Sequence, residues 1–186
     1  MTDIKSLIHK RIKEKNKSSI AKNNLLWFFL SSSFISFLFL TIVYTSVKSG
    51  QFQVSPIFYL STILVVLNSI SIHFSYHFYQ KDEIEKGIMM LLVSACVTLM
   101  FMMSQMIGWS QLFERYFDVL KTNLMLFVLL SGFHFAHILG GLIFVVYLLV
   151  SHYQFKIHSK SINGIRNATY YFHALGFVWL ALFVLF

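Results

Sequence analysis

The chain has 186 residues, of which 57% are hydrophobic, 18% aromatic and only 12% charged. This composition excludes a disordered chain and is typical of an integral membrane protein. The formal net charge of +8 does not indicate nucleic-acid binding, because the basic residues lie in a tail and in short connections beside apolar segments.

Five apolar segments are long enough to cross a bilayer, which takes about 20 residues. The connections between them are short and leave no room for a soluble domain. We therefore predict an all-α integral membrane protein, with a basic tail over residues 1–23 and a bundle of five transmembrane helices over residues 24–186. In chain order, the predicted spans cover residues 25–47, 56–78, 87–109, 124–150 and 167–186.

Lysine and arginine are distributed asymmetrically between the two ends of these spans. Seven lie in the tail, two in the second connection and three in the fourth, which places twelve on one side of the membrane. The other side has only Lys48, Arg115 and Lys121. Because basic residues favour the cytoplasmic side, the counts predict a cytoplasmic N-terminus and an external C-terminus.

None of the seven carboxylates lies within a predicted span. Proton pumps and ion-coupled carriers commonly use intramembrane acids, so this distribution weighs against a proton or ion relay in this chain. A small transporter is one alternative function. It is disfavoured by the same distribution and by the lack of an internal repeat.

Five histidines lie in the predicted spans: His73, His77, His134, His137 and His173. His134 and His137 are three residues apart in the middle of the fourth span, so their rings share one helix face. An imidazole inside a bilayer needs a partner, and hydrogen bonds across helices can supply it. A zinc site is disfavoured because the spans offer no supporting cysteine or carboxylate cluster.

A haem-b membrane anchor is the main alternative function. Counted from the inner ends of their spans, His73 is about five residues deep and His173 about seven, which places both roughly 8–10 Å from the same membrane surface. Two histidines at one level on different helices can act as the axial ligands of a haem. An absorption spectrum of the chain alone would distinguish this anchor from a protein without haem.

The fourth span carries Gly132, His134, His137 and Gly141 in register with a Gly-x-His-Gly-x-His-Val-x-x-Gly motif. This motif resembles the signature of subunit III of haem-copper respiratory oxidases. Glycines at these positions, together with Gly140, are expected to be points where helices approach closely.

The fifth span is similar to the same family's Tyr-Trp-His-Phe-x-Asp-x-x-Trp motif. His173 and Trp179 match it, while Gly176 replaces the aspartate. The third span resembles the family through Gln105 and Trp109. In the first span, Ser33 stands where the family usually has a carboxylate.

The resemblance covers the chain from about residue 25 to its end, in the form of bacterial members that lack the two leading helices of the seven-span form. It implies an accessory subunit of a terminal oxidase that reduces oxygen and moves protons, with cytochrome c or quinol as the electron donor. Such a subunit has no catalytic residue and holds neither haem nor copper, both of which are expected in its partners.

The resemblance also implies catalytic subunit I (and II) as partners, bound phospholipid, a role in proton uptake and sustained turnover, and a bacterial inner (cytoplasmic) membrane location. Membership of a larger respiratory supercomplex stays open, and nucleic acid is not an expected partner. His134, His137 and His173 are expected to be buried hydrogen-bonding and packing residues.

Overall fold

The computed structural model describes residues 24, 27–28, 30–47, 55–116, 121–153 and 162–185, and all the regular elements in these ranges are α-helices. Five of them are long and apolar enough to cross a membrane, which confirms the predicted number of spans. The chain divides into two units, residues 1–36 and residues 37–186. The predicted basic tail over residues 1–23 lies outside the described residues.

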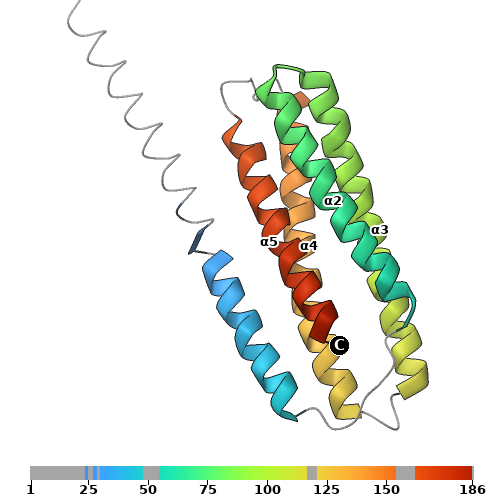
Figure 1. The fold of residues 1–186 in the computed structure, drawn as a ribbon. Helices are drawn as coiled ribbons and strands as arrows, with labels where there is room; N and C mark the ends of the chain where they lie inside the picture. Colours follow the sequence, from blue (N-terminus) through green and yellow to red (C-terminus); the bar gives the residue numbers. More distant parts are fainter. Residues whose placement is uncertain are drawn as a thin grey trace, which may run out of the picture. The chain divides into compact units, whose positions relative to one another are not determined.

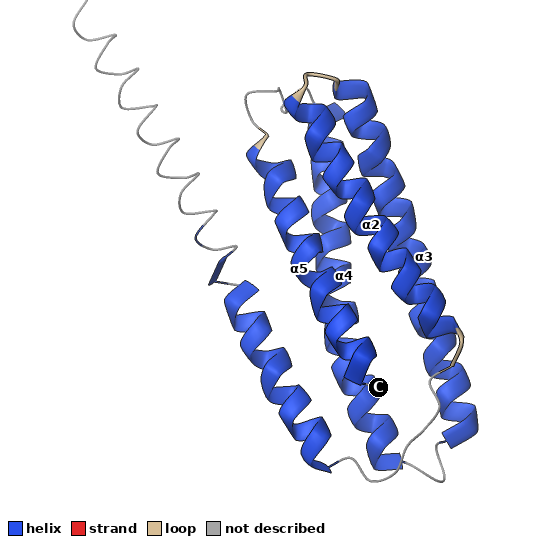
Figure 2. Ribbon diagram, in the orientation of Figure 1, coloured by secondary structure: helices blue, strands red, loops and turns tan. Residues whose placement is uncertain are grey.

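The second unit contains a bundle of four long helices (Figure 1). Each helix packs against two neighbours: α2 lies beside α3 and α5, and α4 lies beside the same two helices. The four therefore form a closed ring, and no strand interrupts it in the described ranges (Figure 2). The helices are α2 (Ile57–Gln80), α3 (Ile84–Tyr116), α4 (Lys121–Tyr153) and α5 (Asn163–Leu185).

The helices begin earlier or end later than the predicted spans. For example, α3 covers Ile84–Tyr116, whereas the apolar segment predicted a span over residues 87–109. The additional turns carry polar side chains such as Glu85 and Arg115. The apolar segment predicts only the part of a helix that lies in the hydrocarbon core. The helix itself is longer, because its backbone hydrogen bonds continue into the polar region.

A tight turn connects α2 to α3. Asp82 adopts a left-handed backbone conformation with φ of 61°, and the N–H of Glu83 donates to the carbonyl of Phe78 at 3.0 Å. Gly87 lies against the ring of Tyr79, so closely that an added Cβ would be 2.6 Å from that ring. Gly87 thus allows the first turn of α3 to approach the end of α2.

The helical segment Leu30–Val47 extends over the boundary between the two units. Its hydroxyl groups bond within the segment: Ser31 donates to the carbonyl of Trp27 and Ser36 to that of Ser32. This local bonding suits a polar side chain in an apolar environment. In the second unit, Phe37 is buried in a cluster with Leu130 and Leu182.

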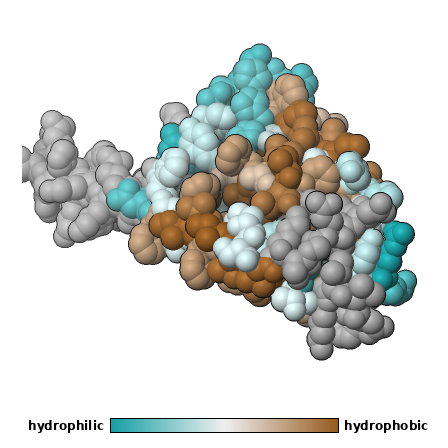
Figure 3. Space-filling model, turned by 60° about the horizontal axis from the view of Figure 1, so that its bottom comes forward, coloured by the Kyte–Doolittle hydropathy of each residue, from teal (hydrophilic) through white to brown (hydrophobic). Residues whose placement is uncertain are grey.

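Large hydrophobic side chains also lie on the outside of the protein, as expected where acyl chains replace water as the solvent. Figure 3 shows hydrophobic residues gathered over the middle of one face, with hydrophilic residues towards its edge. Strongly exposed examples are Ile63, Met103, Ile143 and Phe177.

Candidate functional site

His134 lies in the centre of the bundle and is 0% exposed. Aromatic rings surround its imidazole: the ring centroids of Phe37 and Phe101 are both 6.0 Å away, and that of Trp179 is 5.3 Å away. Neither of its ring nitrogens has a hydrogen-bond partner among the described residues. The structure therefore places His134 among packed rings, without the hydrogen bond that the sequence predicts.

His137 occupies the edge of the same helix face and is partly exposed. Its Nδ1 is 2.7 Å from the carbonyl oxygen of Phe133 on its own helix, and its ring lies 5.4 Å from that of Phe37. The backbone carbonyl of His137 accepts a hydrogen bond from the Tyr171 hydroxyl on α5 at 2.8 Å. The two histidines of the motif thus differ, since one is in the core and the other is at its margin.

Trp179 connects α5 to three other helices. Its indole nitrogen donates to the Thr62 hydroxyl on α2 at 3.1 Å, and its ring packs edge-on against Phe101 on α3, with centroids 5.2 Å apart. The contact with His134 on α4 completes this set. Because Trp179 is only 1% exposed, the hydrogen bond to Thr62 also satisfies the buried N–H.

Trp109 and Gln105 lie on α3, facing α4 and the core. The indole nitrogen of Trp109 donates to the Ser131 hydroxyl at 3.0 Å, and its ring lies 5.2 Å from that of Phe135. Gln105 is 1% exposed, and its amide has no hydrogen-bond partner in the described ranges. Ser33 lies in the first unit, partly buried in its helical segment.

The glycines of the fourth span differ in their surroundings. A Cβ added to Gly141 would lie 2.9 Å from the rings of both Phe172 and Tyr171, so α4 and α5 approach closely there. At Gly140 the nearest atom would be 3.8 Å away, an ordinary contact. At Gly132 no atom of the described residues would lie within 4 Å. The described residues therefore approach closely at Gly141 and not at Gly132.

His73 and His173 lie side by side on α2 and α5, with ring centroids 5.6 Å apart, so the prediction that they share one level is confirmed. His173 Nδ1 also bonds to the Ser69 hydroxyl at 2.5 Å. Further α2–α5 hydrogen bonds lie on both sides of this pair, from Thr169 to the carbonyl of Ile72 and from Trp179 to Thr62. Helices joined so directly leave no room for a macrocycle between them, and these residues do not fit a haem.

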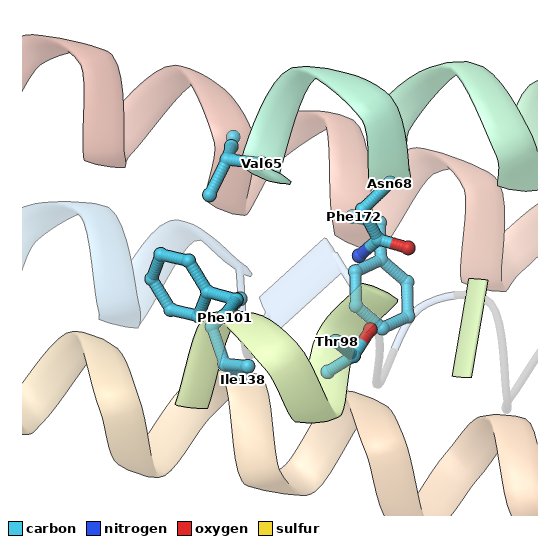
Figure 4. Close-up of a pocket in the computed structure, with 7 residues that line it drawn as sticks. Val65, Asn68, Thr98, Phe101, Ile138 and Phe172 are labelled. Carbon is cyan, nitrogen blue, oxygen red and sulfur yellow. The ribbon is translucent and has the colours of Figure 1, made fainter. Parts of the chain in front are cut away.

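Gly176 lines a small cavity of about 10 Å³ between the four helices. The Oδ1 of Asn68 accepts a hydrogen bond from Ser94 at 2.6 Å, and Thr98 donates to the Ser94 carbonyl at 2.8 Å. Figure 4 shows Asn68 and Thr98 near the ring of Phe172, and Phe101 apart from them near Ile138. The remaining lining residues are Val65 and Ile138, and a Cβ added to Gly176 would lie 3.3 Å from the Val65 side chain.

In the described ranges, no group of three or more histidine, cysteine, aspartate or glutamate side chains is positioned to hold a metal ion.

Phe37 is a core residue that sequence reasoning missed. Hydroxyl and apolar side chains are mixed on all sides of its segment, so the pattern does not distinguish the buried face from the exposed one.

Residues 19–186 match the model of a family described as cytochrome c oxidase subunit III. The chain is similar to cytochrome c oxidase subunit 3 of Pan troglodytes, with 28% identity over 126 residues that make up 67% of this chain and 47% of the relative. It is 24% identical to the Chondrus crispus protein of the same name, over 68% of this chain and 46% of that relative. The chain thus spans about half the length of these curated relatives.

Proposed function

Because the chain belongs to the cytochrome c oxidase subunit III family, we propose that it is an accessory subunit of a haem-copper terminal oxidase. It packs against catalytic subunit I, and against subunit II, in a complex that reduces oxygen and moves protons. The observation that carries this proposal is the family match over residues 19–186, a range that includes the five described helices that are long and apolar enough to cross a membrane. Haem and copper belong to the partner subunits.

The interior of the chain supports a packing role. Its core consists of aromatic rings around Trp179, joined by hydrogen bonds between uncharged groups such as Thr62 and Ser131. The carboxylates in the described helices lie near their ends, at Glu85 and Glu114. A bundle with this interior can provide a rigid surface against which the catalytic subunit packs. Its contribution to proton uptake is then indirect, through the stability of the catalytic subunit and its lipids.

Co-purification tests the proposal. The tagged full chain is extracted from its own membranes in mild detergent, and the bound polypeptides are identified. We expect catalytic oxidase subunits and the absorption bands of their haems to accompany it, and oxidation assays with reduced cytochrome c and with quinol then identify the donor. A tagged unrelated five-span protein is the control. A pure complex of the oxidase that lacks this chain would contradict the proposal.

The orientation is a further part of the proposal: the tail over residues 1–23 is cytoplasmic and the C-terminus external in a bacterial inner membrane. The basic residues at one end of the bundle support it. In a Cys96→Ala background, an impermeant maleimide is expected to label Gln111→Cys but not Lys81→Cys in intact cells. Both positions are exposed: Lys81 follows the last residue of α2, and Gln111 lies near the far end of α3. The reverse labelling would overturn the orientation.

A further inference from the structure

Among the buried polar side chains that have no hydrogen-bond partner within the described ranges, two lie in the middle of the bundle on neighbouring helices. They are Gln105 on α3, for which neither amide atom is paired, and His134 on α4, for which neither ring nitrogen is paired. Gln105 is 1% exposed and His134 is 0% exposed. Buried polar atoms in proteins are nearly always hydrogen-bonded, because they lose their water without compensation otherwise. Four such atoms in one core indicate a site.

The contacts between α3 and α4 place His134 about one helical turn from Gln105, towards the N-terminal end of α3. One turn after Gln105, the indole of Trp109 bonds to Ser131, and one turn before it, the ring of Phe101 lies against His134. Gln105 lies between these two contacts on the same helix. Long side chains lean towards the N-terminus of their own helix. Gln105 therefore leans towards the level of His134, and His134, on a helix that runs in the opposite direction, leans towards the level of Gln105.

The surroundings leave few other partners. The Ser131 hydroxyl accepts from Trp109 and donates to the Phe127 carbonyl, so its proton is already in use. The rings of Phe37, Phe101 and Trp179 offer no acceptor oxygen to His134. A neutral imidazole has one donor and one acceptor nitrogen, and the glutamine amide has both kinds of group. The four atoms match a ligand that donates and accepts at once.

We propose that Gln105 and His134 form a neutral binding site for a single water molecule, which bridges α3 and α4 in the middle of the membrane. A water molecule has the size and the mixed donor and acceptor character that the site requires. The bridge adds a second polar contact between α3 and α4, about one turn from the hydrogen bond of Trp109 to Ser131. This inference concerns the chain by itself and does not depend on an oxidase partner.

A double-mutant cycle on the full chain in nanodiscs tests the site. Gln105→Leu and His134→Phe each leave the other side chain buried without a partner, and each is expected to lower the thermal midpoint by about 3–8 °C. The double variant removes both polar groups and is expected to recover most of that loss. The matched control combines Gln105→Leu with His137→Phe, whose effects are expected to add, since His137 bonds within its own helix.

The water itself is tested by infrared difference spectra in H2¹⁶O and H2¹⁸O. We expect one isotope-sensitive O–H band from a buried water in the unaltered chain, lost in each single variant. If the effects of Gln105→Leu and His134→Phe on the thermal midpoint are coupled but the band is absent, the two side chains bond directly and the water site is wrong. If the two effects simply add, the pairing of Gln105 with His134 is wrong. If a variant does not fold, ¹⁵N spectra of histidine in the unaltered chain decide, because an unbonded imidazole at position 134 contradicts the site.

Discussion

The Trp179 indole donates a hydrogen bond to the Thr62 hydroxyl at 3.1 Å, and this contact joins the last helix of the bundle to α2. Thr62 in turn donates to the Phe58 carbonyl at 2.9 Å, one turn earlier on α2. Phe58 stacks on Trp179, with ring centroids 6.3 Å apart. The hydrogen bond and the ring stacking therefore join the same two helices, α2 and α5. A change that moves the indole affects both contacts.

We predict that Thr62→Val, which keeps the shape but removes the acceptor, lowers the thermal midpoint of the full chain by about 2–4 °C. Trp179→Phe is expected to cost more, because it also leaves part of the core unfilled. The two changes together are expected to cost less than the sum, since both remove the same hydrogen bond. Unfolding in detergent followed by near-UV circular dichroism measures this, with Ile63→Val on the exposed face of α2 as the control.

Gly141 and Gly132 offer a matched pair on α4. Gly141→Ala places a methyl group 2.9 Å from the rings of Tyr171 and Phe172, so we expect α4 and α5 to separate locally and the midpoint to fall. Gly132→Ala meets no described residue within 4 Å and is expected to be neutral or stabilising, because alanine favours the helix by about 1 kcal/mol over glycine. Equal effects of the two substitutions would contradict this reading of the contact.

The sequence allowed the number of spans to be predicted because a segment of about 20 apolar residues has few other uses in a protein. It also placed His73 and His173 at one level, since depth follows from counting along two helices. It could not distinguish Gly141 from Gly132, because a glycine shows that close approach is possible without showing which neighbour is there. The hydrogen-bond partner of His134 could not be predicted for a similar reason, because the groups that face a helix are known only once the neighbouring helices are placed.

Between α2 and α3, Glu83 forms an ion pair with Lys86 at 2.7 Å. The hydrogen bond from Lys86 holds the pKa of the Glu83 carboxyl below its usual value. Because the folded-state pKa is the lower one, any stability gained is present above the pKa of the unfolded chain and is lost as the pH falls through the folded pKa. In ¹³C spectra, we expect Lys86→Gln to raise the pKa of Glu83, while Lys81→Gln raises it less. An unchanged pKa in Lys86→Gln would contradict the pairing.

The contact between His73 and His173 predicts that the purified chain, apart from any oxidase, shows no b-type haem band in a reduced-minus-oxidised spectrum. The direct hydrogen bonds between α2 and α5 on both sides of the pair are the reason. Reconstitution with added haem is expected to leave the spectrum of the unaltered chain the same as that of His173→Ala. A band that appears in the first and not in the second would instead establish a haem site.

Gly176 is the position where a charge can be tested inside the bundle. Asparagine and aspartate have nearly the same volume, and their Cβ atom would meet Val65 at 3.3 Å, so both require the same small adjustment. The cavity beside Gly176 contains Asn68 and Thr98 but no cation among its lining residues. A carboxylate there is desolvated without an opposite charge, whereas an amide needs only hydrogen bonds. We therefore predict that Gly176→Asp lowers the thermal midpoint at neutral pH more than Gly176→Asn does, and that the gap narrows in acid as the carboxylate is protonated. If the difference in thermal midpoint between the two variants does not change with pH, the shape of the side chain at position 176, and not its charge, determines the loss of stability.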